Sequence, residues 1–339
     1  MSGSTRFWIG ASTVGALGSP ARGIRPLDVA ADGSAALGEP VDVGVNPMFL
    51  ARRAEGAAAI VHELAEGLVS MWRIDEGGVS PVAGPTPTGA ADPCHVAFSA
   101  DGEFVVTANY SGGRVTAHRA ADGRLVSSIA FAGSGPRADR QESPHPHQVT
   151  VDAARDRLLV PDLGADRVRV VRISADGTLS HDTGEDIALH AGAGPRHLAI
   201  SGDLAVVANE LDRTASVIDL SSDVEGATVP FGPEVEARGF GASAIRITRA
   251  GIVVIGDRDL DGVQTLRLDA SARTLRHLGS LATGGVHPRD LELTADERFV
   301  VVADQGSDSV AVVELGASGA PVRVAATAAT PAPACVLRL

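Results

Sequence analysis

The sequence predicts an all-β protein that forms a seven-bladed β-propeller of four-stranded blades, closed by strands from both termini. Three observations predict this fold. Short aliphatic runs that end in Gly, Asp or Asn occur along the whole chain. A repeat of about fifty residues recurs, and the two ends of the chain together supply the strands of one more repeat. We expect residues 1–339 to form a single domain.

Each copy of the repeat has an apolar run, a turn, a second apolar run that ends in a polar residue, and a third, alternating run. The six copies open at Pro47, Pro93, Pro146, Pro195, Ala242 and Pro288. Neighbouring openings are 46 to 53 residues apart, which is the size of a propeller blade. Helical solenoids have similar periods, but alternating and continuous apolar runs are typical of strands.

The seventh blade is predicted from both ends of the chain. The segment PACVLRL from Pro333 resembles the opening strand of the repeat, and Phe7–Ser12 resembles the second strand. Arg25–Ala30 and Pro40–Gly44 are expected to supply the third and fourth strands. A composite blade removes the free sheet edge of an open ring. For this reason we interpret the N-terminal segment as structure rather than as a signal peptide, which would also need a less polar core.

The composition excludes several classes of function. The formal net charge of −13 argues against nucleic acid as a partner, because phosphate binding needs a basic face. No apolar run approaches transmembrane length, so we expect no membrane partner. All 29 basic residues are Arg, which excludes lysine nucleophiles and Schiff bases. Cys94 and Cys335 fall in blades that are not neighbours, so we predict two thiols and a cytoplasmic location.

Polar residues gather at one predicted end of the blades. In an antiparallel blade the start of the first strand lies beside the end of the second strand, so both reach the same face of the ring. The candidate residues at these places are His95, Asn109, His147, Arg196, His197, Glu210, Arg258 and Arg289. Several ionisable groups around one cavity are costly unless a ligand uses them, so the sequence predicts a site at this mouth of the channel.

Each candidate also has a structural explanation. His95 and His197 could be core histidines, and Arg289 could form a salt bridge between blades. Polar residues at the ends of second strands commonly bind turn backbone groups, and we expect this role for Asp162, Asn209, Asp257 and Asp304.

The candidate residues lie in strings that resemble the β-propeller lactonase family, typified by bacterial 6-phosphogluconolactonase and related to fungal carboxy-cis,cis-muconate lactonising enzyme. The strings are NPMFLA, PCHVAFSADGEFVVTANYSGG, PHPHQVTVD, GAGPRHLAI, VANELD, GDRD and HPRDLELTADERFVVVADQGSDSV. The resemblance implies a seven-bladed propeller with no essential metal or cofactor. It also implies a catalytic site formed by His147, Arg196, Glu210 and Arg258.

Two departures from the family pattern stand out. The first copy has His62 and Glu63 where an Asn-Glu pair is usual. Arg258 lies among three aspartates, which we expect to weaken its hold on an anion; these are Asp257, Asp259 and Asp261.

The resemblance implies a hydrolase that opens a small anionic or sugar-acid lactone. Arg196 and Arg258 would bind the phosphate or carboxylate of the substrate, or stabilise the oxyanion. His147 is the expected general base at neutral pH, whereas Glu210 beside two arginines would be an orienting group. The expected substrate-binding residues are His95, Asn109, His197 and Arg289.

Three alternatives remain open from the sequence. The same residues could serve a muconate-type lactonising cycloisomerase, which would hold a dicarboxylate and move a proton. A propeller can also bind a ligand or a protein without catalysis. His145 and His147, with Glu142 nearby, resemble a chelating pair, but Pro146 is explained by the repeat and two histidines do not complete a coordination shell. We therefore predict no metal site.

Overall fold

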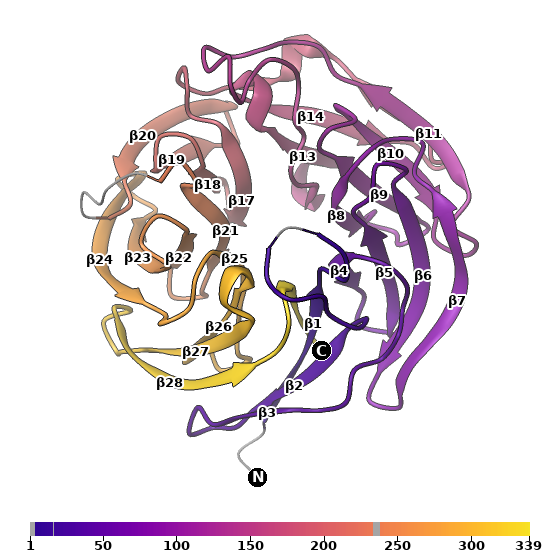
Figure 1. Ribbon diagram of the computed structural model, residues 1–339. Coiled ribbons are helices and arrows are strands. Elements are labelled where there is room, and N and C mark those ends of the chain that lie inside the picture. The colour runs from indigo at the N-terminus through magenta and orange to yellow at the C-terminus, as the bar shows by residue number, and fades with distance from the viewer. Residues whose placement is uncertain (1–3, 16, 233–237) are drawn as a thin grey trace. The chain divides into compact units, whose positions relative to one another are not determined.

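The computed structural model describes residues 4–15, 17–232 and 238–339 (Figure 1). Within these residues the strands form seven antiparallel sheets, which we call blades; six have four strands and one has five. This all-β arrangement confirms the predicted fold class. The chain clusters into two compact units, the terminal unit (Met1–Val45 with His197–Leu339) and the central unit (Asn46–Arg196). The single domain that the sequence suggests stays a prediction.

The central unit contains three blades. The first comprises β4 (Pro47–Arg52), β5 (Ala57–His62), β6 (Leu68–Asp75) and β7 (Gly78–Pro87). The second comprises β8 (Pro93–Phe98), β9 (Phe104–Asn109), β10 (Arg114–Arg119) and β11 (Leu125–Ala130). The third comprises β12 (Thr150–Asp152), β13 (Arg157–Asp162), β14 (Arg167–Ile173) and β15 (Leu179–His181), with β16 (Ile187–Ala188) also paired to β14. This third blade holds the short 3₁₀ helices η1 (Ala153–Arg155), η2 (Leu163–Ala165) and η3 (Thr183–Glu185).

The terminal unit contains four blades. Three of them are continuous in sequence. The first comprises β17 (Pro195–Ser201), β18 (Leu204–Asn209), β19 (Thr214–Asp219) and β20 (Val224–Pro230). The next comprises β21 (Ala242–Ile247), β22 (Ile252–Asp257), β23 (Gly262–Asp269) and β24 (Thr274–Ala282). The last of the three comprises β25 (Pro288–Leu293), β26 (Phe299–Asp304), β27 (Ser309–Leu315) and β28 (Pro321–Ala329). The 3₁₀ helix η4 (Gln305–Ser307) follows β26.

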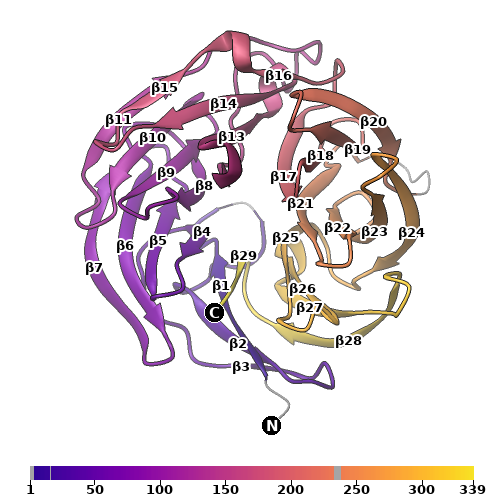
Figure 2. The same ribbon diagram turned by 180° about the vertical axis from the view of Figure 1, so that it is seen from behind.

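The fourth blade of the terminal unit joins the two ends of the chain. Its strand order is β29 (Pro333–Arg338), β1 (Thr5–Ala11), β2 (Arg25–Val29) and β3 (Ala35–Leu37). β29 pairs antiparallel with β1, and Figure 2 shows the two strands side by side. The predicted closure by strands from both termini is confirmed.

The predicted fourth strand of this composite blade is wrong. The strand is Ala35–Leu37 rather than Pro40–Gly44, and within the latter segment Val41 forms only an isolated bridge with Ile24. The cause is a tight turn, in which Ala30 donates its N–H to the carbonyl of Ser34 and Gly33 adopts a φ of 87°. Because Gly accepts this backbone conformation without strain, the chain reverses at once and the next strand starts at residue 35.

One pairing pattern recurs in five blades. The opening residue of the first strand lies opposite the last residue of the second strand, and the next residue is an extra one that forms a β-bulge. The paired residues are Pro47 and His62, Pro93 and Asn109, Ala242 and Asp257, Pro288 and Asp304, and Pro333 and Ala11. Within each blade, the predicted proximity of these two strand ends is confirmed. A bulge re-aims the side chain that it carries, so the position after the opening residue is suited to ligand contact.

The core lies between neighbouring blades and is aliphatic, as the composition predicts. In the terminal unit one cluster joins β26, β27, β1, β2 and β29, and it includes the fully buried Phe7 and Phe299 with Val301 and Val336. Burial of each such side chain contributes roughly 1.5–3 kcal/mol relative to exposure. Both cysteines are buried thiols, as predicted. In the described part of the chain no helix is long and apolar enough to cross a membrane.

One blade lacks a polar pair that five others contain. In those blades the residue that ends the second strand contacts a polar residue on the third strand. The pairs are His62 and Ser70, Asn109 and Thr116, Asp162 and Arg169, Asn209 and Ser216, and Asp257 and Gln264. In four of these pairs the two residues are seven positions apart in the sequence. In the β25–β28 blade the residue seven positions after Asp304 is Ala311, which has no polar side-chain atom.

Asp304 is therefore an unusual buried carboxyl group. Its Oδ1 accepts a hydrogen bond of 2.9 Å from Thr283 Oγ1, but Oδ2 has no partner among the described residues. The expectation that Asp304 binds turn backbone groups is wrong, whereas Asp162 and Asp257 do accept backbone N–H groups. Burial raises the pKa of Asp304 to about 7; the bond from Thr283 opposes this shift, and the charge of a nearby aspartate adds to it.

The wild-type protein is expected to lose stability as the pH rises toward 7, and Asp304→Asn is expected to remove this loss. The native state holds the proton of Asp304 up to about pH 7, whereas an ordinary Asp loses it near 3.8. The free energy of unfolding of the wild type therefore falls as the pH rises through this window, by up to about 4 kcal/mol relative to the variant. Asparagine ends the second strand in two other blades, so the variant should fold. Urea unfolding of both proteins at roughly pH 4, 5.5 and 8 measures the difference.

Two controls sharpen this experiment. Burial lowers the pKa of His118 to about 4, which makes stability rise with pH up to about 6.5. Comparison of the wild type with Asp304→Asn cancels this opposite slope. Ala311→Ser restores the hydroxyl found in other blades, so it should lower the pKa of Asp304 and shrink the effect. A difference between wild type and Asp304→Asn that stays constant with pH would contradict the assignment.

Candidate active site

Two predicted site residues meet in the terminal unit as a buried ion pair. Glu210 directly follows β18, and Arg258 directly follows β22. Arg258 Nη2 lies 2.6 Å from Glu210 Oε2, and both side chains are buried. The guanidinium also donates to the carbonyl of Ala242 at 2.8 Å and approaches that of Gly241 at 3.5 Å. Among the described residues these contacts involve Nε and Nη2, so the two N–H donors of Nη1 are left for a ligand.

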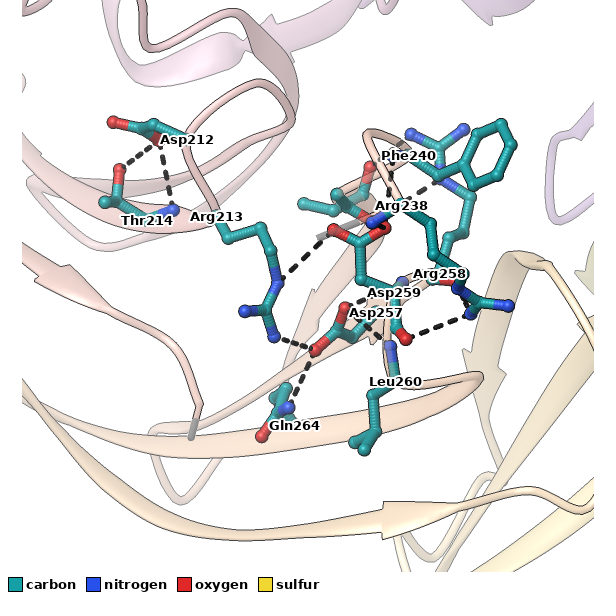
Figure 3. Close-up of polar contacts among 12 residues, drawn as sticks. Asp212, Arg213, Thr214, Arg238, Phe240, Asp257, Arg258, Asp259, Leu260 and Gln264 are labelled. Carbon is teal, nitrogen blue, oxygen red and sulfur yellow. Dashed lines mark hydrogen bonds and ion pairs between the residues drawn. The ribbon is translucent and has the colours of Figure 1, made fainter. Parts of the chain in front are cut away.

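The aspartates near Arg258 bind other groups. Asp257 Oδ2 accepts hydrogen bonds from Arg213 Nη2 at 2.6 Å and from Gln264 Nε2 at 2.8 Å. Asp259 lies 3.7 Å from Arg213 Nε. Figure 3 shows Arg213 pointing toward both carboxylates. The sequence suggested that these acids would weaken Arg258, but the carboxylate that contacts Arg258 is Glu210.

A second arginine fixes the backbone around Arg258. Arg238 Nη2 contacts the carbonyl of Arg258 and donates to the carbonyl of Asp259 at 3.0 Å (Figure 3). It also lies 2.9 Å from Asp261 Oδ2. Asp259 Oδ1 in turn accepts the backbone N–H groups of Arg238 and Phe240 at 3.2 and 3.1 Å. Arg238 and Phe240 are thus tied to the turn that carries Arg258, which restricts the movement of the ion pair.

His147 has a defined environment in the central unit. Pro146 bridges to Asp162, but β12 starts only at Thr150, so His147 lies in an interruption of the first strand. Its N–H donates to the carbonyl of Pro161 at 2.9 Å. The imidazole is buried, with Nδ1 at 3.7 Å from Cys94 Sγ and its ring edge-on to Tyr110 at 5.4 Å.

Tyr110 is a contact that the sequence analysis did not select. It directly follows β9, just as Glu210 directly follows β18 and Arg258 directly follows β22. This equivalent position in the repeat is the feature of the sequence that could have identified Tyr110 as a site residue. It also stacks on His145 with ring centroids 4.4 Å apart. His145 Nδ1 contacts the carbonyl of Tyr110 at 3.1 Å, and Nε2 contacts Glu142 at 3.2 Å.

Those contacts occupy both ring nitrogens of His145. In the residues that the structure describes, no three His, Cys, Asp or Glu side chains gather in a way that could hold a metal ion. The absence of a metal site stays a prediction.

The remaining candidates lie in buried surroundings. His95 Nδ1 accepts the N–H of Val149 at 3.4 Å, and its ring lies 4.0 Å from that of Phe49. Asn109 is fully buried and donates to Thr107 Oγ1 at 3.0 Å. Such contacts are typical of residues that stabilise the blade.

Three further candidates lie at the starts of first strands. Arg196 and His197 are buried in β17, and Arg289 is half-buried in the bulge of β25. Their roles in binding stay predictions.

Comparisons with known proteins agree with this architecture. The family described as "Lactonase, 7-bladed beta-propeller" matches residues 6–338. A 6-phosphogluconolactonase of Bacillus subtilis is 27% identical over 306 residues, which cover 86% of each chain. A 6-phosphogluconolactonase of Sodalis glossinidius is 31% identical over 75% of this chain and 76% of its own. The structure of the periplasmic gluconolactonase of Pseudomonas aeruginosa is 25% identical, with a TM-score of 0.89 over 99% of both chains. This chain belongs to the lactonase family of seven-bladed β-propellers.

Proposed function

We propose that the chain hydrolyses a sugar-acid lactone of the gluconolactone type. The observation that carries the proposal is the buried ion pair between Glu210 and Arg258, which leaves guanidinium donors for an anionic oxygen. The relatives named above support the proposal, because their names describe enzymes that act on gluconolactone or on 6-phosphogluconolactone.

The proposed reaction adds water to the lactone carbonyl. His147 takes a proton from the attacking water, and the carbonyl oxygen gains negative charge. The ring C–O bond then breaks, and the leaving oxygen takes a proton to become a hydroxyl group. Arg258, together with Arg196, stabilises the oxyanion or holds the acidic group of the substrate, since charge-assisted bonds in a sheltered site are strong.

Glu210 acts in this proposal through Arg258. A carboxylate bonded to a guanidinium fixes the direction of its remaining N–H donors, which matters because Arg binds oxyanions through a rigid fork. Glu210 is therefore a positioning residue, and the proton transfer belongs to His147.

Glu210→Gln and Arg258→Lys are expected each to lower kcat/KM by about tenfold. The lysine keeps the positive charge but loses the fork, and the amide keeps the shape of Glu210 but loses its charge. Because Glu210 acts through Arg258, the double variant should be little worse than Arg258→Lys alone. Steady-state kinetics on all four proteins measure this coupling. Effects that multiply would show that Glu210 acts independently.

A panel of lactones tests the proposed function itself. Phosphorylated and unphosphorylated sugar lactones are assayed against their spontaneous hydrolysis, with dicarboxylate lactones included to test cyclisation in reverse. We expect acceleration of at least one sugar-acid lactone. If the protein accelerates none of them but still binds the ring-opened acids, the proposal fails and a ligand-binding propeller replaces it.

A further inference from the structure

Three residues take equivalent places in the terminal unit, and the proposed reaction uses only two of them. Glu210, Arg258 and Gln305 each directly follow the second strand of a blade. The equivalence extends to the backbone, because the N–H of Arg258 donates to the carbonyl of Gly241 at 3.0 Å and that of Gln305 to the carbonyl of His287 at 3.1 Å. The β25–β28 blade therefore has the amide side chain of Gln305 at the position where the other two blades have the members of the ion pair, Glu210 and Arg258.

The amide oxygen of Gln305 has no donor within the described residues, although the side chain is only 2% exposed. Gln141 gives a direct comparison because it is also buried. Its Oε1 accepts the N–H of Arg137 at 3.1 Å, and its Nε2 donates to the carbonyl of Leu163 and to Asp166. A buried acceptor without a donor destabilises the fold, so buried amides are normally bonded as in Gln141. Within the part of the chain that the structure describes, Gln305 Oε1 is therefore a buried acceptor that still lacks a donor.

An exposed aromatic ring lies next to the same segment. Phe240 is 45% exposed in a chain with only 3% aromatic residues. Its ring packs against that of His287, with centroids 5.2 Å apart and planes at 79°. His287 thus contacts both Phe240, through its ring, and Gln305, through its carbonyl.

Backbone geometry holds Phe240 beside the ion pair. The following residue, Gly241, has a φ of +52°, and a Cβ there would lie 1.6 Å from the carbonyl oxygen of Glu210. Only glycine permits this approach. In Figure 3 the ring of Phe240 lies at the same end of the network as the guanidinium of Arg258.

We propose that Phe240 and Gln305, joined through His287, form a subsite for the polyhydroxylated part of the lactone. The ring of Phe240 packs on the C–H face of the sugar, and Gln305 Oε1 accepts a hydrogen bond from one hydroxyl group. This inference rests on the proposed function and names its substrate class. A site that hydrogen-bonds a substrate hydroxyl discriminates strongly against an analogue that lacks it.

The first experiment compares two substrates, glucono-δ-lactone and δ-valerolactone, which has no hydroxyl groups. In Gln305→Leu the ratio of kcat/KM for glucono-δ-lactone to that for δ-valerolactone should fall about tenfold. The melting temperature should be retained, because the leucine removes a buried acceptor that lacked a donor. Gln141→Leu is the matched control, since it should lower the melting temperature and leave the substrate ratio unchanged.

Phe240→Ala tests the other half of the subsite. Loss of the ring should lower kcat/KM for glucono-δ-lactone about fivefold, and Phe240→Trp should restore most of it. An alanine variant with wild-type kcat/KM would overturn the role of the ring.

Calorimetry with sodium gluconate separates this inference from the proposed function. If the wild type hydrolyses no lactone, the proposed function fails, and gluconate binding that is lost in Gln305→Leu would still support the subsite. If the wild type hydrolyses glucono-δ-lactone and Gln305→Leu keeps the wild-type substrate ratio, the subsite is overturned while the lactonase stands. A melting temperature of Gln305→Leu as low as that of Gln141→Leu would also overturn it, because Gln305 would then be structural.

Discussion

Replacement of His147 by alanine is expected to lower kcat by about 10²–10⁴-fold, the usual effect of losing a positioned general base. The position of His147 supports this expectation. Its backbone N–H donates to the carbonyl of Pro161, and its imidazole contacts Cys94 Sγ and the ring of Tyr110. A base with so few remaining orientations needs little reordering when the substrate binds. Steady-state kinetics on a hydrolysed lactone, together with the melting temperature, provide the measurement.

His145→Gln is the matched control for this experiment. His145 lies two residues away and packs on the same tyrosine, but its ring nitrogens contact a backbone carbonyl and Glu142. Its replacement should affect the melting temperature more than kcat. A His147→Ala variant that folds normally and keeps nearly wild-type kcat would exclude His147 as the base.

Deletion of residues 333–339 is expected to abolish cooperative folding of the terminal unit. The deletion removes β29, and with it the strand partner of β1 and the buried side chain of Val336. It also removes the Val336 N–H that donates to Asp290 Oδ2 at 2.9 Å. Burial raises the pKa of Asp290, and both this bond and the charge of Arg246 oppose that shift. The truncated chain would therefore keep a buried carboxyl group with one fewer donor.

The expected loss is as large as the whole stability of an ordinary domain. Each large apolar side chain that is exposed costs roughly 1.5–3 kcal/mol, while total stabilities are about 5–15 kcal/mol. The exposed edge of β1 would also favour aggregation. Size-exclusion chromatography and thermal denaturation of the truncated chain measure the outcome, with deletion of Leu339 alone as the control. A truncated chain with an unchanged cooperative melt would show that β29 is dispensable.

The sequence was most informative where strand ends repeat. The antiparallel repeat predicted that the start of a first strand lies beside the end of the second strand, and the structure pairs Pro93 with Asn109 and Pro288 with Asp304. The short β3 was missed because three residues, of which Ala36 is exposed, are too few to show an alternating pattern in the sequence.

Side-chain partners were harder to predict than positions. Glu210 and Arg258 were both selected, but three aspartates lie closer to Arg258 in sequence, and only the fold shows which carboxylate reaches the guanidinium. The sequence does not distinguish Asp304 from the other strand-end residues, because cross-strand pairing decides which third-strand residue lies near it.

The composite blade has a consequence for synthesis on the ribosome. β1 is made before the other strands of these seven blades, yet the strand that pairs with it on one side is β29, which is made after them. At about 5–20 residues per second, the nascent protein waits roughly 15–60 s before β29 is made. During this time β1 presents unpaired N–H and C=O groups, a template for other extended chains. The composite blade therefore makes an early strand dependent on a late one, and this edge of β1 stays open until β29 has been made.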